Sequence, residues 1–431
     1  MPDAVLLSGS LGLGHEMMMR SSASLLERSG WRTRSLDSMA LLGPRGGAAA
    51  ERLFGGLIAR PGIYDGLHFA HLRTGSRLAD FMSRQATARL IPALAADLER
   101  RPADLVLSVF ATGATAAAKL KAAAPARRTV VLCTDVTPHR IWVCEGTDLF
   151  LVTSPAAAAS VRRFLPRALV SVVPPPVRAA FYAAPSQRDA RQALGIPPGE
   201  PCLLMIDSGW GAGPLVQSVA ALAQAGVHVL AVAGRQPAIE RQLRALARTL
   251  PQVKPFGFTD RVPELMAAAD VVLALPGANT CGEARVVGRR LLLLDVMPGH
   301  WRDNLQHELE LGAADVCGPS VAGITASALA LLDKTSRPVP SSGPVPRWEP
   351  AAIAAFRQIG LDLRPDHRPD AAVPVAAHVG GSDYRGSDYR GSDHRGSDHR
   401  GPDRGGTGHG GSDHGGSDHG ALAAPQYDIR G

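Results

Sequence analysis

The sequence predicts an α/β protein made of two successive domains, each with a parallel sheet covered by helices. Short apolar runs of strand length alternate with longer Ala-, Leu- and Arg-rich helical segments, and the alternation starts again after a break near the middle of the chain. Strands that alternate with helices favour parallel sheets with helices on both faces. At 431 residues and 45% hydrophobic composition, the chain is long enough for two such domains.

Eight apolar runs carry this prediction, four in each half of the chain. They are Ala4 to Ser8, Leu105 to Val109, Thr129 to Cys133, Leu149 to Thr153, Cys202 to Ile206, His228 to Ala233, Val271 to Leu275 and Leu291 to Leu294. Helical segments such as Ala86 to Glu99 and Glu240 to Leu250 lie between them. Each half therefore has the strands and helices of one doubly covered sheet.

Proline, glycine and a composition shift set the expected boundaries. The run at 171–176 and the loop that follows it interrupt the pattern. Beyond Pro365 the chain no longer has a globular pattern, and residues 381–420 form eight five-residue units such as GSDYR and GSDHR, whose few apolar residues cannot offset the entropy of ordering. We expect an amino-terminal domain over 1–180, a linker over 181–200, a carboxy-terminal domain over 201–335, a Pro-rich segment over 336–365 with a short helix near 349–359 that packs back across the domains, and a disordered tail over 366–431.

Composition argues for a cytoplasmic protein. No apolar run approaches the roughly 20 residues of a membrane span, and the first residues lack the pattern of a signal peptide. Five scattered cysteines without CxxC spacing suggest neither a zinc site nor a disulfide framework. A reducing compartment fits these features best.

The net charge of +7 is unevenly placed. Lys and Arg outnumber Asp and Glu by 22 to 13 over residues 1–180, against 24 to 26 in the rest. This asymmetry favours an acidic partner, either nucleic acid or an anionic membrane, although a high-GC coding bias toward Arg is an equal alternative. Aromatic residues at 5% and the absence of a recognition motif speak against nucleic acid.

In each predicted domain, a glycine-rich turn follows the first strand. The first runs from Ser8 to His15 and the second includes Ser208, Gly209 and Gly211. Small residues between a strand and a helix let a phosphate approach the helix amino terminus, where free N–H groups attract negative charge. His15 also lies at the carboxyl end of a parallel strand, where ligands bind in such sheets, although a lone loop histidine is more often a surface residue.

A third turn opens after the strand ending at Leu275. Gly277 and Asn279 allow a tight turn there, Thr280 is expected to cap the next helix, and Glu283 is expected in the first turn of that helix. The simplest role for Glu283 is a capping carboxylate.

Three segments resemble glycosyltransferase family 28, in particular its monogalactosyldiacylglycerol synthases and processive diacylglycerol glucosyltransferases. Gly257 to Asn304 is similar to the donor-binding segment of that family, and Ser8 to His15 to its glycine-rich strand end with a histidine. Thr134 to Trp142 resembles its TDFxxHxxW segment. The resemblance covers about residues 4–333 and so involves both predicted domains.

This resemblance implies a GT-B fold, in which two Rossmann-like domains face across a cleft, with a uridine diphosphate (UDP) sugar as co-substrate and no bound metal or other cofactor. Glu283 would then hold ribose hydroxyls, because a carboxylate accepts two hydroxyl protons well. The implied donor-binding residues are Ser208, Gly209, Gly211, Phe258, Gly277, Asn279, Thr280, Glu283, Pro298, Gly299, His300 and Asn304, and the implied acceptor-binding residues are Gly12, Gly14, Arg60, Tyr64, His139 and Trp142.

The resemblance also implies inverting transfer of a hexose or N-acetylhexosamine. His15, or Asp135 in its place, would take a proton from the acceptor hydroxyl as it attacks the anomeric carbon. Arg52 to Phe69 combines apolar, aromatic and basic side chains, and in the lipid glycosyltransferases this region approaches the membrane. We therefore expect a diacylglycerol-like acceptor at the anionic inner face of the plasma membrane. Ordinary core packing is the alternative for this segment.

One departure from the family pattern leaves the donor sugar open. The family's PGQExxN is Pro298-Gly-His300-Trp301-Arg-Asp-Asn304 here, so the Gln and Glu that read sugar hydroxyls are His and Trp. Two alternatives remain. One is an enzyme like the UDP-sugar 2-epimerases, whose acid and base carboxylates are not evident beside the glycine-rich loops. The other is a non-catalytic UDP-sugar-binding scaffold.

Overall fold

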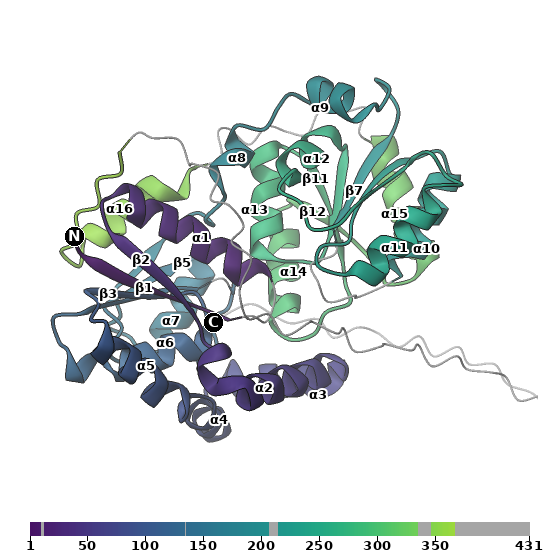
Figure 1. Cartoon of the computed structure of the whole chain (residues 1–431). Coiled ribbons are helices and arrows are strands. Elements are labelled where there is room, and N and C mark those ends of the chain that lie inside the picture. Colours follow the sequence, from purple (N-terminus) through teal and green to yellow (C-terminus); the bar gives the residue numbers. More distant parts are fainter. Residues whose placement is uncertain (10–12, 134, 207–213, 335–345, 367–431) are drawn as a thin grey trace, which may run out of the picture. The chain divides into compact units, whose positions relative to one another are not determined.

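Two parallel sheets of six strands each organise the chain. Figure 1 shows the computed structural model. The structure describes residues 1–9, 13–133, 135–206, 214–334 and 346–366. Both sheets lie within one unit of the chain, Met1–Ala377. We call the part built on the first sheet the amino-terminal domain and the part built on the second sheet the carboxy-terminal domain.

The first sheet has the strand order β2-β1-β3-β4-β5-β6, and every pair of neighbours is parallel. Its strands are β1 Asp3–Ser8, β2 Arg32–Asp37, β3 Leu105–Ser108, β4 Arg128–Leu132, β5 Leu149–Val152 and β6 Val170–Val172. The helices of this domain are α1 Leu13–Arg28, α2 Gly43–Ile58, α3 Pro61–Leu67, α4 Arg77–Thr87, α5 Leu90–Arg100, α6 Ala111–Lys119 and α7 Pro155–Phe164, with short helical turns at Ala40–Leu42, His68–Leu72 and Lys121–Ala123.

The second sheet repeats the design with the order β12-β11-β10-β7-β8-β9, again all parallel. Its strands are β7 Cys202–Ile206, β8 His228–Val232, β9 Val253–Phe256, β10 Val271–Ala274, β11 Arg290–Leu294 and β12 Ala314–Cys317. The remaining helices are α8 Ala179–Tyr182, α9 Gln187–Leu194, α10 Leu215–Gln224, α11 Pro237–Leu246, α12 Val262–Ala268, α13 Ala278–Val287, α14 His300–Glu310, α15 Val321–Asp333 and α16 Trp348–Arg357.

Alternating side chains along each strand build a core on both faces of the sheet. In β1, Leu6 packs in the cluster that contains α1 and α16, whereas its neighbour Leu7 packs in the cluster that contains α5 and α6. Successive strand residues point to opposite faces, so a fully apolar strand supplies both clusters. The second sheet is covered in the same way, by α10, α11 and α15 on one face and by α9, α12 and α13 on the other.

The expected helix near 349–359 is present as α16 and returns to the amino-terminal domain. Its buried Trp348 and Phe356 join Leu6 and Leu25 in one hydrophobic cluster, and Arg28 of α1 pairs with Glu349 at 2.5 Å. The expectation that this segment packs back is therefore confirmed, and the amino-terminal core is completed by residues from beyond the second sheet.

All eight expected strands are present, but four strands were not predicted from the sequence. These are β2, β6, β9 and β12, which are the four outer strands of the two sheets. The prediction of one helix over Ala86 to Glu99 is also wrong, because α4 ends at Thr87 and α5 begins at Leu90. In the described part of the chain, no helix is long and apolar enough to cross a membrane.

Truncating the buried side chain of Phe356 on α16 should destabilise the amino-terminal domain. Phe356 is fully buried, so Phe356→Ala should lower the free energy of unfolding by about 3 to 5 kcal/mol, measured by guanidinium unfolding. The matched control is Phe81→Ala on α4, because Phe81 is 50% exposed and its loss should change stability by about 0.5 kcal/mol or less. Equal effects of the two substitutions would contradict this packing role for α16.

Candidate functional site between the two domains

The candidate site is formed where segments that follow the carboxyl ends of several strands meet. His15 follows β1, Asp135 follows β4, the Gly277 turn follows β10, and the Pro298-Gly299 loop follows β11. In parallel α/β sheets these ends are where ligands bind. Four predicted residues, Gly12, Ser208, Gly209 and Gly211, lie outside the described residues.

His15 occupies the first turn of α1 with its ring held by the backbone. Its Nδ1 lies 2.7 Å from the carbonyl oxygen of Val109. Because a carbonyl can only accept, Nδ1 carries the proton of a neutral ring and Nε2 keeps its lone pair. Burial lowers the pKa of His15, although Asp135 and the Val109 carbonyl act in the opposite sense. A neutral ring with a free Nε2 is the form that can accept a proton.

Asp135 is a buried carboxylate fixed by an indole. The Nε1–H of Trp142 donates to its Oδ2 at 2.7 Å, and both side chains are buried. Burial alone raises the pKa of Asp135. The pKa is nevertheless below its ordinary value, because the nearby imidazoles of His300 and His139 lower it, as do the hydrogen bond from Trp142 and the ring of His15. Trp142, which the family resemblance implies in acceptor binding, is thus placed behind Asp135 as its hydrogen-bond donor.

Two further histidines lie close to Asp135. Burial lowers the pKa of His139 to about 4 and that of His300 to about 4, and in each case Asp135 opposes the shift. The Nδ1 of His139 accepts a hydrogen bond from the backbone N–H of Ile141 at 3.3 Å, which leaves its proton on Nε2. Both rings are therefore neutral at pH 7.

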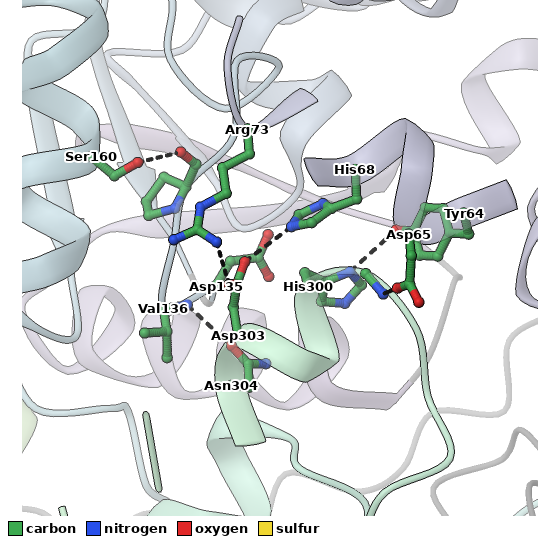
Figure 2. A network of polar contacts seen from close by, with 12 residues as sticks. Tyr64, Asp65, His68, Arg73, Asp135, Val136, Ser160, His300, Asp303 and Asn304 are labelled. Atoms are coloured by element: carbon green, nitrogen blue, oxygen red, sulfur yellow. Dashed lines mark hydrogen bonds and ion pairs between the residues drawn. The ribbon is translucent and has the colours of Figure 1, made fainter. Parts of the chain in front are cut away.

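The Pro298-Gly299 loop is held by α3 of the other domain (Figure 2). The hydroxyl of Tyr64 lies 3.2 Å from Nδ1 of His300, and the N–H of Gly299 donates to Asp65 Oδ1 at 2.6 Å. Gly299 has a positive φ of 68°, and a Cβ there would lie 2.5 Å from Tyr64 Cε1. Only glycine fits both the backbone conformation and this close approach.

The first turns of α14 make three more contacts with the amino-terminal domain. Asp303 accepts from His68 Nε2 and from Arg73, each at 3.0 Å, and Asn304 Oδ1 accepts from the N–H of Val136 at 3.2 Å (Figure 2). Asp65, His68, Arg73 and Asp303 were not predicted as site residues. Their partners lie more than 200 positions away in the sequence, so no spacing could have indicated them.

The turn before α13 corrects two expectations about capping. The cap of α13 is Gly277, without a side-chain hydrogen bond, so Thr280 is inside the helix and is not its cap. The first turn of α13 has no acidic residue, and Glu283 lies in the second turn. Asn279 instead donates across the domains to the carbonyl of Gly14 at 2.7 Å.

Glu283 is a buried carboxylate rather than a capping one. Burial raises its pKa to about 7, and Arg178, 3.8 Å away, acts in the opposite direction. Such a group is poorly solvated when charged, so hydroxyl donors from a ligand would stabilise its ionised form.

Two other predicted site residues lie at the surface. Phe258 is 39% exposed, with the guanidinium of Arg235 over its ring. Arg60 is an exposed residue at the start of α3.

Acid should destabilise the folded protein through the two buried neutral imidazoles. Their pKa values are about 4 when folded against 6.5 in the unfolded chain, so the unfolded state binds more protons between these values. The stabilisation is complete above pH 6.5 and is lost as the pH falls toward 4. His139→Gln with His300→Gln should flatten the pH dependence of the unfolding midpoint, whereas His307→Gln on α14 serves as the control. Unchanged slopes would contradict the burial of neutral rings.

The comparisons with known proteins agree with this architecture. Residues 214–312 match the glycosyltransferase family 28 C-terminal domain. The processive diacylglycerol beta-glucosyltransferase of Bacillus pumilus is 28% identical over 187 residues, which cover 42% of this chain and 49% of that protein. Monogalactosyldiacylglycerol synthase 1 of Arabidopsis thaliana is 26% identical over 196 residues, covering 43% and 36%. The matched region is thus less than half of each relative's length.

Two solved structures share the fold. UGT89C1 of Arabidopsis thaliana, solved with UDP, aligns with a TM-score of 0.52 at 14% identity over 83% of this chain and 99% of that chain. Acinetobacter baumannii MurG aligns with a TM-score of 0.51 at 13% identity over 83% and 100%. With two six-stranded parallel sheets, this chain has the GT-B fold, and its residues 214–312 are similar to the C-terminal domain of glycosyltransferase family 28.

Proposed function

We propose that this protein transfers a hexose or N-acetylhexosamine from a UDP-sugar to the hydroxyl of a diacylglycerol-like lipid, with inversion at the anomeric carbon. The relatives that align with the chain are named as a diacylglycerol glucosyltransferase and as monogalactosyldiacylglycerol synthases, which supports a lipid acceptor and a hexose donor. The UDP in one structure of the same fold supports the donor nucleotide.

The observation that carries the proposal is the state of His15. Its proton is held on Nδ1 by the Val109 carbonyl, its pKa is lowered by burial, and the Asp135 carboxylate acts on it electrostatically. These are the features of a general base, because Nε2 can take the acceptor proton and Asp135 can stabilise the resulting imidazolium. Attack from this side, opposite the diphosphate, gives an inverted product.

The donor side is supplied by the carboxy-terminal domain. The amino terminus of α13 presents free backbone N–H groups after Gly277, and these would stabilise the charge that develops on the leaving diphosphate. Glu283 would accept the ribose hydroxyls. In this proposal the leaving group is stabilised by backbone dipoles, and no metal ion takes part. Among the described residues, no group of three or more His, Cys, Asp or Glu side chains is arranged to hold one.

The acceptor side would meet the membrane through α2, α3 and α4. Four large apolar side chains on these helices, Leu53, Ile63, Leu78 and Phe81, are between 43% and 68% exposed. Arginines lie within three positions of them in the sequence, at 52, 60, 77 and 84. Exposed apolar groups among arginines are typical of a surface that binds an anionic bilayer, which supports the proposal of a peripheral protein at the inner face of the plasma membrane.

The proposal is tested by offering labelled UDP-glucose, UDP-galactose and UDP-N-acetylglucosamine with vesicles that contain diacylglycerol and an anionic lipid. We expect one donor to give a labelled glycolipid with inverted anomeric configuration, at the same rate with and without EDTA. UDP binding without any product would favour the non-catalytic scaffold, and a donor recovered with altered configuration at C2 would favour the epimerase. Loss of transfer in EDTA would contradict the metal-free mechanism.

Substituting His15 should remove the general base. We expect His15→Ala to lower kcat by about 10² to 10⁴-fold while the affinity for UDP stays unchanged. The matched control is His228→Ala, because His228 begins β8 and so lies at the end of its strand opposite the site. Near-normal turnover by His15→Ala would move the base assignment to Asp135.

A further inference from the structure

Tyr64 is a buried tyrosine of the amino-terminal domain that contacts the Pro298-Gly299 loop of the other domain and the histidine that follows it. Its side chain is 5% exposed, its ring packs on Gly299, and its hydroxyl lies 3.2 Å from His300 Nδ1. The neighbouring Asp65 holds the N–H of Gly299 and pairs with Arg302 at 3.1 Å. One short helix, α3, therefore fixes the start of α14 through a ring contact, two hydrogen bonds and an ion pair.

The hydrogen bond between Tyr64 and His300 sets which ring nitrogen of His300 carries the proton. Burial lowers the pKa of His300 to about 4 and raises that of Tyr64, so both groups are neutral at pH 7. A buried hydroxyl that only accepted would leave its own proton without a partner, which is unfavourable. When the hydroxyl of Tyr64 donates to Nδ1, His300 carries its proton on Nε2.

The position of His300 would let its Nε2–H donate a hydrogen bond to a ligand bound beside Asp135. In Figure 2 its ring lies between Tyr64 and Asp135, and Asp135 is the charged group with the largest effect on it. His300 follows the Pro298-Gly299 loop and begins α14. A fixed Nε2–H at this position offers one hydrogen-bond donor, and no acceptor, to a group bound beside Asp135.

We propose that Tyr64 is a positioning residue that holds His300 with Nε2–H as a hydrogen-bond donor to a hydroxyl of the transferred sugar, and so makes His300 a specificity-determining residue. The inference rests on the proposed function. It also assigns Tyr64 a role different from direct acceptor binding: the amino-terminal domain, through α3, completes the recognition of the donor sugar bound by the carboxy-terminal domain.

The first test compares Tyr64→Phe with the wild-type full chain. The substitution keeps the ring that packs on Gly299 and removes only the hydroxyl. We expect affinity for the preferred UDP-sugar to fall about two- to tenfold, the loss of one hydrogen bond, with affinity for UDP itself unchanged. Tyr182→Phe is the matched control, since its hydroxyl bonds the backbone of Pro346. Equal losses for UDP and UDP-sugar, or no loss, would overturn the proposal.

A second test reads the tautomer directly. In ¹⁵N-histidine-labelled full-length protein, the signal of His300 is assigned by its disappearance in His300→Gln, and we expect the proton on Nε2 in the wild type and a changed tautomer ratio in Tyr64→Phe. A wild-type proton on Nδ1 would sink the inference even if no variant could be purified. Adding Tyr64→Phe to His300→Gln should cause no further loss of UDP-sugar affinity, whereas additive losses would show that Tyr64 acts independently.

These measurements separate the inference from the proposed function. Binding of UDP-sugar against UDP and the tautomer of His300 can both be measured without turnover. If no glycolipid forms but Tyr64→Phe selectively weakens UDP-sugar binding, the transferase assignment fails and the role of Tyr64 stands. If glycolipid forms and Tyr64→Phe binds UDP-sugar normally, the opposite holds.

Discussion

Burying the carboxylate of Asp135 between two domains is unfavourable unless its charge is compensated. The indole of Trp142 donates a hydrogen bond to this carboxylate, and imidazoles from both domains lie near it. This arrangement explains why His15, His139 and His300 stay neutral although a negative charge lies near them: burial opposes the imidazolium form more strongly than the carboxylate favours it. The chemistry proposed for the site depends on this balance.

Ion pairs join the domains beside apolar contacts, such as that of Ile58 on α2 with the core of the carboxy-terminal domain. Three ion pairs across the interface have arginines that are 41 to 49% exposed. They are Asp303 with Arg73, Asp65 with Arg302, and Glu16 with Arg235. Pairs of this kind contribute about 0 to 1 kcal/mol each, because water solvates the separated partners well. These ion pairs can be broken and remade at little cost, whereas the hydrophobic clusters inside each domain cannot.

The sequence predicts the inner strands because they are buried on both faces and read as continuous apolar runs. Outer strands such as β2, Arg32–Asp37, have one neighbour and carry polar residues, so their pattern is that of a loop. The site was predictable in part for a similar reason: His15 and Asp135 follow inner strands, whose carboxyl ends share one edge of the sheet. The partners Asp65 and Asp303 were not predictable, because their pairing depends on how two separately folded domains meet. Glu283 was placed one turn too early because no capping side chain marks where α13 begins.

The chain passes between the domains twice, once after β6 and once before α16, since Trp348 and Phe356 return to the core of the amino-terminal domain. A single covalent connection would leave the carboxy-terminal domain free to swing in any direction. Two connections restrict its motion mainly to rotation about the line that joins them. The same arrangement means that the carboxy-terminal sheet is topologically an insertion within the amino-terminal domain, so no single cut of the backbone separates the two domains and leaves the amino-terminal core whole.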